Sequence, residues 1–193
     1  MSFRPFTDSA ILARSKVKYF GAYPAGFLQR ARDMLAVTGD DQVLHVCSGR
    51  VWDYRCGPSC KGYTETHRHG LGPLDITMDL DAELQPDIIG DAGKVADYER
   101  AFTEHPQIQA VLADPPYTRE FAKEYRPGAD RFITADQIVK CAIAVLPIGG
   151  RVGVLSLHWP RYPKSRARQI AVMAVYVGNG NLGRTFAVFE KTA

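Results

Sequence analysis

Apolar residues recur at helical spacing in three stretches of the chain. Residues 25–37 place apolar side chains on one face with arginines between them, which predicts an amphipathic helix that ends before Gly39. A second helix is predicted over residues 93–102. A third is predicted over residues 134–146, because that stretch opens on a threonine able to cap it and is followed by two glycines.

Short apolar runs alternate with these helices and predict strands. The predicted strands cover residues 42–47, 74–80, 87–90, 108–113 and 151–157. Residues 170–177 and 184–189 are joined by the turn-forming sequence Gly-Asn-Gly-Asn, which predicts a closing β-hairpin. The alternation predicts an α/β fold whose mostly parallel sheet is covered on both faces, with the C-terminal antiparallel β-hairpin as its edge.

Length and composition narrow the class of protein. The chain has 193 residues, of which 46% are hydrophobic and 23% charged, and this fits a single domain, 1–193. Within it, we expect residues 1–40 to form an N-terminal cofactor-binding and helical segment and residues 50–73 to form a Cys/His-rich loop insertion. No apolar run approaches the roughly 20 residues that span a bilayer, and the N-terminus lacks the apolar core of a secretion signal. We therefore expect a cytoplasmic protein without disulfide bonds.

Polar residues follow three of the predicted strands at the points where they end. Ser48 and Gly49 follow the first strand, and Asp79 and Asp81 end the second. Residues 114–117 follow the fourth. Parallel α/β sheets bind ligands beyond the carboxyl ends of their strands, where the strand order reverses, so these features predict one shared site.

The sequence Asp114-Pro115-Pro116-Tyr117 is the most specific chemical signal in the chain. Average residue usage gives it by chance in about one chain per thousand of this size. Two prolines make the backbone rigid, so the Asp114 carboxylate and the Pro115 carbonyl can present acceptors at fixed positions. An exocyclic amino group that donates to both would direct its lone pair toward a methyl donor, while Tyr117 offers a face on which a base can stack. The simpler alternative is a turn that only ends the strand.

This motif resembles motif IV of the S-adenosylmethionine-dependent amino-methyltransferases that act on N6 of adenine or N4 of cytosine in DNA, particularly the small phage and prophage type. The resemblance implies a Rossmann-like class I methyltransferase fold. It also implies that Asp114, Pro115 and Tyr117 are catalytic and hold a base swung out of its stack. Methyl transfer would be direct, and adenine N6 in DNA is the first acceptor to expect.

The resemblance extends in family order over residues 18–117 and implies a cofactor site. Residues 18–27 are similar to the aromatic segment that helps to hold S-adenosylmethionine, and residues 43–49 to the first cofactor-binding strand and turn, although the usual second glycine is missing. Residues 87–92 are similar to the segment whose aspartate accepts a hydrogen bond from the cofactor's adenine. The implied cofactor-binding residues are Tyr19, Tyr23, Cys47, Ser48, Gly49, Asp79, Asp81 and Asp91.

The charge distribution favours a polyanionic substrate. The net charge is +3 and the pI about 8.7, and the basic residues gather in residues 14–18, 119–131 and 161–168, whereas acidic residues gather in residues 75–97. We expect nucleic acid, DNA rather than RNA and no membrane, to follow basic side chains. They are Arg119, Lys123, Arg126, Arg131, Arg161, Lys164, Arg166 and Arg168. Because no separate recognition domain is evident, three alternatives stay open: the sequence specificity is short and loose, a protein partner or a homodimer supplies it, or the substrate is a structured RNA.

Four potential metal ligands lie close together in the loop insertion. Cys56, Cys60, His67 and His69 could bind zinc tetrahedrally, but a single residue between the histidines is tighter than usual for metal sites. Simple loop residues, or polar groups facing the nucleic acid, are therefore favoured over zinc. Cys141 lies in an apolar helical pattern, which indicates a core residue.

Two other functions remain open at this point. One is methylation of adenine N6 in RNA. The other is a non-catalytic nucleic-acid-binding module that kept the fold after its cofactor turn degenerated. A cytosine-C5 methyltransferase is disfavoured because the motif contains no thiol, and the chain has no phosphate-binding Gly-Lys-Ser/Thr motif.

Overall fold

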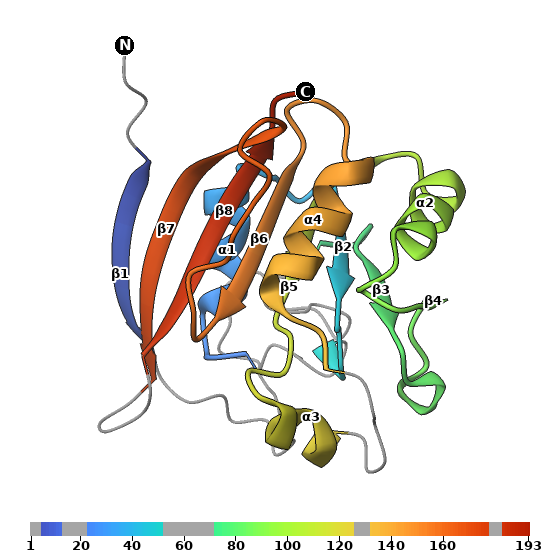
Figure 1. Ribbon diagram of the computed structural model, residues 1–193, viewed down its shortest axis with the longest axis horizontal. Helices are drawn as coiled ribbons and strands as arrows, with labels where there is room; N and C mark the ends of the chain where they lie inside the picture. The colour runs from blue at the N-terminus through green and yellow to red at the C-terminus, as the bar shows by residue number, and fades with distance from the viewer. Residues whose placement is uncertain (1–4, 13–22, 52–71, 126–131, 178–182) are drawn as a thin grey trace.

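The computed structural model describes residues 5–12, 23–51, 72–125, 132–177 and 183–193. The described elements form one twisted sheet with helices on both faces (Figure 1). In chain order they are β1 (Phe6–Leu12), α1 (Phe27–Leu35), β2 (Gln42–Val46), β3 (Ile76–Asp79), the 3-10 helix η2 (Ala82–Leu84), β4 (Ile88–Ile89), α2 (Val95–Glu104), β5 (Ile108–Ala113), α3 (Arg119–Tyr125), α4 (Ala135–Val145), β6 (Arg151–Ser156), β7 (Ala167–Val177) and β8 (Arg184–Lys191).

The sheet reverses its strand order in the middle. The order across it is β1-β7-β8-β6-β5-β2-β3-β4, and β2 pairs in parallel with both β3 and β5. From β2 the chain builds outward first through β3 and β4, and then on the other side through β5 and β6. The boundary between β2 and β5 is therefore the switch point at which such sheets bind ligands.

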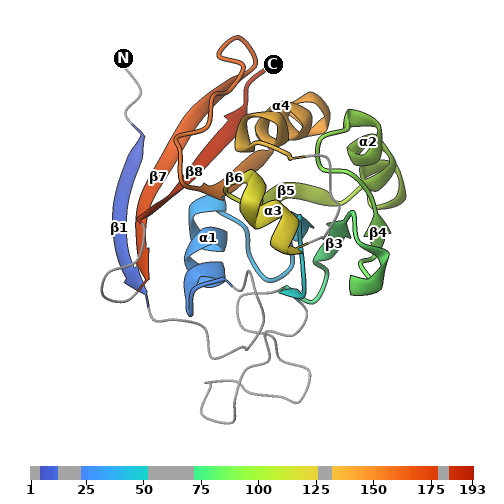
Figure 2. The ribbon, with the colours of Figure 1, turned by 60° about the horizontal axis from the view of Figure 1, so that its bottom comes forward.

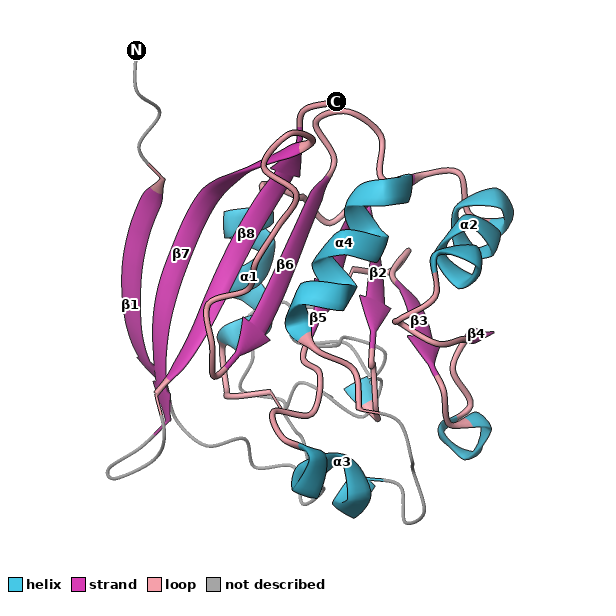
Figure 3. Cartoon of the chain, in the orientation of Figure 1, coloured by secondary structure: helices cyan, strands magenta, loops and turns pink. Residues whose placement is uncertain are grey.

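Helices cover the two faces of the sheet separately (Figure 3). Neighbouring residues of β5 show this: Val111 belongs to the core cluster shared with α4 and α2, whereas Leu112 belongs to the cluster shared with α1. Successive side chains of a strand point to opposite faces, so both faces of the central strands are apolar and buried. The expected parallel α/β sheet is confirmed.

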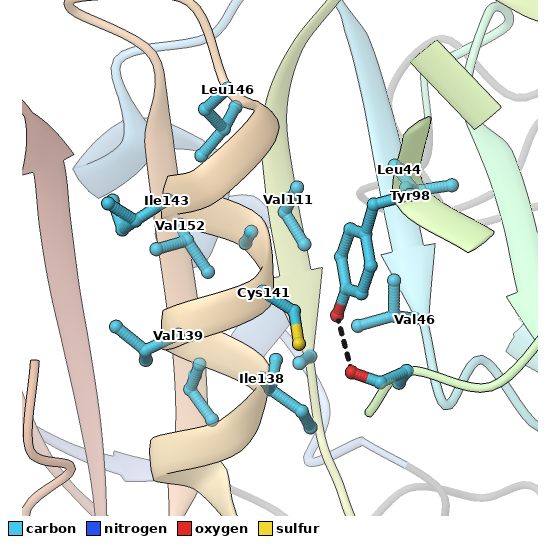
Figure 4. Close-up of a cluster of buried hydrophobic side chains, with 14 of the residues drawn as sticks. Leu44, Val46, Tyr98, Val111, Ile138, Val139, Cys141, Ile143, Leu146 and Val152 are labelled. Carbon is cyan, nitrogen blue, oxygen red and sulfur yellow. Dashed lines mark hydrogen bonds between the residues drawn. The ribbon is translucent and has the colours of Figure 1, made fainter. Parts of the chain in front are cut away.

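The core beneath α4 fixes the position of the strand ends. Ile138, Cys141 and Ile143 of α4 are buried against the sheet (Figure 4). Tyr98 of α2 is completely buried, and its hydroxyl donates to the carbonyl of Ala92 at 3.1 Å. The tyrosine thereby anchors the segment that follows β4. The prediction that Cys141 is a core residue is confirmed.

The helix predicted over residues 134–146 forms as α4, and its N-terminus has the expected cap. Thr134 Oγ1 accepts from the Gln137 backbone N–H, and Gln137 Oε1 accepts from the Thr134 backbone N–H. This reciprocal capping box satisfies two backbone donors that a helix end otherwise leaves unpaired.

The closing hairpin forms as β7 and β8, but its predicted place at the edge is wrong. β8 inserts antiparallel between β6 and β7, and β1 pairs in parallel with the far side of β7. β1 was not predicted because only Ala10 and Leu12 of its seven residues are buried, which leaves no readable alternation. The short helix α3 was also not predicted.

The sequence also predicted a cytoplasmic location and a Cys/His-rich loop insertion at residues 50–73. Among the described residues no helix is both long and apolar enough to cross a bilayer. The cytoplasmic location stays a prediction. So does the role of residues 50–73, because most of that stretch, 52–71, lies outside the described residues.

Candidate functional site

Four neighbouring strands bring their carboxyl ends to one point at the switch of the sheet. Burial raises the pKa of the Cys47 thiol at the end of β2, and the charges of Asp79, Asp114 and Asp91 raise it further. Asp79 ends β3, Asp114 follows β5 and Asp91 follows β4, and all three lie near the same thiol. Figure 2 looks toward this end of the sheet, with α3 lying across it. The structure thus gathers residues that the sequence predicted as one site.

The turn after β2 has an unusual backbone. Cys47 has a φ of 52° and Gly49 a φ of 53°, both in the left-handed region. For a residue with a side chain such as Cys47 this conformation costs about 1 kcal/mol or more, and it is typically retained at functional sites. Gly49 N–H donates to Asp79 Oδ2 at 2.8 Å, which ties the turn to the end of β3. An ordered turn therefore forms without the usual second glycine.

Ser48 offers an unused hydrogen-bonding group inside this turn. Its side chain is 6% exposed, and within the described part of the chain Ser48 Oγ has no hydrogen-bond partner. A buried polar group without a partner costs free energy, unless a ligand or ordered water supplies the missing bond. Ser48 is therefore well placed to contact a ligand at the turn.

Three further predicted cofactor residues are engaged in local structure. Asp91 Oδ1 accepts from the Gly93 N–H at 2.8 Å, and Asp81 Oδ1 accepts from the Glu83 N–H at 2.9 Å to cap η2. Tyr23 is buried and stacks on Phe27 at a centroid distance of 5.2 Å. The cofactor roles of these residues stay predictions, and Tyr19 lies outside the described residues.

The motif after β5 forms an internal contact. The hydroxyl of Tyr117 donates to Asp114 Oδ1 at 2.6 Å. Burial raises the pKa of the Asp114 carboxyl to about 7, while the Tyr117 hydrogen bond and the charge of Arg184 act in the opposite direction. Pro115 is buried and, lacking an N–H, ends the strand ladder. Near neutral pH Asp114 therefore exists in both its protonated and its ionised form.

Arg184 belongs to this cluster and was not predicted from the sequence. Its guanidinium carbon lies 4.9 Å from the ring centroid of Tyr117, in a cation–π contact. Phe121 of α3 packs against the same tyrosine with ring centroids 6.5 Å apart and an interplanar angle of 88°. Nothing in the sequence links Arg184 to Tyr117, since only the insertion of β8 next to β6 brings them together.

The predicted basic residues do not form a single track. Arg119 and Lys123 are exposed on α3, at the carboxyl end of the sheet, and Arg161 N–H donates to Asp136 Oδ1 at the start of α4. Lys164, Arg166 and Arg168 lie at the opposite, amino end of the sheet, where β7 begins beside the end of β8. These three residues are separated from α3 because residues 157–166 run back along the sheet so that β7 can lie parallel to β6, and their role in nucleic acid binding stays a prediction.

Arg168 has a local electrostatic role instead. Its guanidinium forms an ion pair with Glu190 at 2.7 Å, and Arg151 binds the same carboxylate at 3.0 Å. This cluster joins β6, β7 and β8 at the amino end of the sheet. Arg126 and Arg131 fall outside the described residues, so their predicted role stays untested.

The four candidate zinc ligands also lie outside the described residues. Cys56, Cys60, His67 and His69 all lie within residues 52–71, which are not described. Among the residues that the structure describes, no three His, Cys, Asp or Glu side chains are grouped so as to hold a metal ion.

No protein-family model matches this sequence, and neither does any curated protein. Among solved structures, the chain is similar to TrmN from Thermus thermophilus, with 17% identity and a TM-score of 0.56 over 89% of this chain and 50% of that one. The chain thus spans half the length of the TrmN structure.

Two further solved structures resemble the chain more loosely. An rRNA methylase from Streptococcus thermophilus is 12% identical, with a TM-score of 0.48 over 89% of this chain and 100% of that one. An RNA methyltransferase from Salinibacter ruber in complex with S-adenosyl-L-homocysteine is 11% identical, with a TM-score of 0.40 over 89% and 94% of the two chains. The strand order together with the likeness to TrmN shows that the chain has a Rossmann-like methyltransferase fold, as predicted.

Proposed function

We propose that this protein is an S-adenosylmethionine-dependent methyltransferase whose acceptor is an exocyclic amino group of a nucleobase. The observation that carries the proposal is the position of Asp114. Its carboxyl lies at the switch point of the sheet, where, like Asp79 and Asp91, it raises the pKa of the Cys47 thiol. Its hydrogen-bond partner Tyr117 is an aromatic residue able to stack on a base. Methyl donor and acceptor would therefore meet at one strand end.

The residues at the end of β2 fit the cofactor. S-adenosylmethionine carries a positive sulfonium and offers hydroxyl and amino donors, which suit a rim formed by Asp79 and Asp91. The left-handed backbone at Gly49 has no atom within 4 Å of the place where a Cβ would be, so a ligand can approach the turn closely. Ser48 Oγ supplies a further polar contact.

The acceptor side is formed by the motif itself. When bound, the cofactor supplies a methyl group on a positively charged sulfur. Asp114 Oδ1 is held by Tyr117, so Oδ2 is the oxygen that would accept a hydrogen bond from the incoming amino group. With a pKa of about 7, the ionised carboxylate can stabilise the positive charge that develops on the nitrogen and take up the released proton.

Nucleic acid is the substrate class that this arrangement favours. A base can reach Asp114 only after leaving its stack, which costs a few kcal/mol in a duplex and less in a single strand. Exposed Arg119 and Lys123 on α3 lie next to Tyr117 in the sequence and can contact phosphates beside such a base. Adenine N6 in DNA is the first acceptor to test, with adenine N6 in RNA as the alternative.

Calorimetric titration with S-adenosylmethionine tests the cofactor half of the proposal. We expect a dissociation constant below about 1 mM, within the usual range for enzyme ligands. Absence of measurable binding would leave a non-catalytic module as the better description.

Ser48→Ala sharpens this titration. Because Ser48 Oγ has no partner in the described structure, its removal should leave the free protein as stable or slightly more stable. Cofactor binding should nevertheless weaken about threefold to tenfold, the value of one hydrogen bond. The exposed Ser9→Ala on β1 is the matched control. Unchanged affinity in Ser48→Ala would remove the hydroxyl from the cofactor site.

A further inference from the structure

A continuous chain of contacts joins the start of β8 to the proposed acceptor site. Arg184 is the first residue of β8, and its neighbour Thr185 pairs with Ser156 at the carboxyl end of β6. The guanidinium covers one face of the Tyr117 ring at 4.9 Å, and the Tyr117 hydroxyl donates to Asp114. Two contacts therefore connect Arg184 on β8, which lies outside the motif, to the Asp114 carboxyl within the motif.

Arg184 differs from the other half-buried and buried arginines in how its charge is used. Arg32 and Arg151 each form an ion pair with a carboxylate at 3.0 Å or less. Among the described residues Arg184 makes no such pair, although its charge reaches Asp114 and lowers the pKa of that carboxyl. Its placement is therefore not explained by a structural ion pair.

We propose that Arg184 is a positioning residue for methyl transfer, which holds the Tyr117 ring and through it the Asp114 carboxylate. The inference rests on the proposed function and deepens it. With the ring held, the Tyr117 hydroxyl stays on Oδ1 and leaves Oδ2 for the amino group. Because the guanidinium covers one face of the ring, a base must stack on the other face or displace Arg184.

The groups that influence Asp114 come from three elements. Tyr117 belongs to its own loop, Cys47 faces it from the end of β2, and Arg184 faces it from β8. Of these, Arg184 is the one cation recorded against the carboxyl in the described structure. Its removal should therefore favour the protonated form.

The kinetic test compares two substitutions of Arg184. In Arg184→Gln the acid limb of the kcat profile should move about one pH unit to higher pH, because an attractive cation is lost. In Arg184→Lys the limb should stay near its wild-type position, while kcat falls because an ammonium cannot stack as a plane on Tyr117. In both variants the affinity for S-adenosylmethionine should be unchanged.

Arg30→Gln serves as the matched control. Arg30 is an exposed arginine of α1 with a loose 3.6 Å ion pair to Asp8, and it makes no recorded contact with Asp114. Its kcat and pH profile should equal those of the wild type. Thermal unfolding of all three variants checks that each one folds.

A second readout does not depend on activity. The carboxyl of Asp114 can be titrated by carbon-13 NMR, with the signal assigned through Asp114→Asn. We expect its pKa to rise in Arg184→Gln and to stay close to wild type in Arg184→Lys. If wild-type protein transfers methyl groups but neither the kcat limb nor the carboxyl pKa moves in Arg184→Gln, the inference is wrong. If wild-type protein transfers none, the proposed function fails, and an unmoved carboxyl pKa would then refute the Arg184 contact independently.

Discussion

Asp114 occupies an environment that suits a group able to change its charge during a reaction. Burial disfavours its ionised form, whereas the Tyr117 hydroxyl and the Arg184 cation favour it, and the pKa settles at about 7. A general base is most effective when its pKa lies near the working pH. The same three side chains therefore set both where an amino group would bind and when the carboxyl can accept a proton.

This raised pKa predicts a pH dependence of stability in the free protein. A carboxyl whose folded pKa exceeds its unfolded value of 3.8 stabilises the fold at low pH, and that contribution is lost as pH rises toward about 7. We expect the free energy of unfolding to fall by on the order of 3 kcal/mol from this group between pH 4 and pH 7.

Denaturant unfolding of wild type and Asp114→Asn across this range measures the effect. Because asparagine does not titrate, the difference between the two proteins isolates the carboxyl from other groups. The wild type should lose stability relative to the variant as the pH increases. A difference that stays constant with pH would show that the pKa of Asp114 is not raised.

The sequence identified part of this residue cluster. Asp114 and Tyr117 were predicted because they stand in one short motif, where chemistry can be inferred from neighbours. Arg184 could not be predicted, because its partner lies 67 positions earlier in the chain and the contact depends on the order of strands. Ser48 was predicted from its place after a strand, but its buried hydroxyl without a recorded partner became apparent only in the structure.

At the scale of elements, helices with a strong local pattern were predicted from the sequence, whereas β1 and the position of the hairpin, which depend on distant partners, were not. α1 and α4 are both amphipathic, and α4 also has a capping box, so the local sequence is enough to predict them. β1 has few buried residues and is ordered through its pairing with β7, a partner more than 150 positions away. The position of the hairpin likewise depends on the whole sheet, since β8 could have paired at an edge.

The turn after β2 allows a test of backbone conformation. Gly49→Ala places a methyl group in open space, so its effect should come only from the positive φ of 53°. We expect a loss of stability of about 1 kcal/mol and weaker binding of S-adenosylmethionine, because the strained turn shifts away from the ligand-ready form. Gly39→Ala is the matched control, since it also meets open space but has no positive φ. Equal cofactor affinities in the two variants would argue against a role for this turn.

The separation of basic residues predicts unequal contributions to nucleic acid binding. Lys123→Gln on α3 should weaken binding to DNA or RNA and reduce the dependence of log Kd on log salt by about one unit, as expected for one lost phosphate contact. Arg168→Gln, at the opposite end of the sheet, should leave both quantities unchanged. Fluorescence anisotropy over a range of salt concentrations measures them. An equal loss in Arg168→Gln would place nucleic acid along the whole length of the sheet.

At the scale of the molecule, the fold brings distant residues to one edge of the sheet. Parallel pairing of β3, β2 and β5 aligns their carboxyl ends, so Cys47, Asp79 and Asp114 meet although they are far apart in the sequence. Insertion of β8 adds Arg184 to the same edge. The α/β class could be predicted from the alternation of strands and helices, whereas the separation of the basic residues could not, because it depends on the return of residues 157–166 along the sheet.

The most direct measurement is transfer of a labelled methyl group from S-adenosylmethionine to unmethylated DNA, RNA and protein pools, followed by identification of the modified nucleoside by mass spectrometry. We expect the label on an exocyclic amino nitrogen of a base. Asp114→Ala should reduce transfer about a hundredfold or more while still binding cofactor, in line with the loss of one preorganised polar contact. Label on a ring carbon, a ribose or a protein side chain, or full activity in Asp114→Ala, would contradict the proposed chemistry.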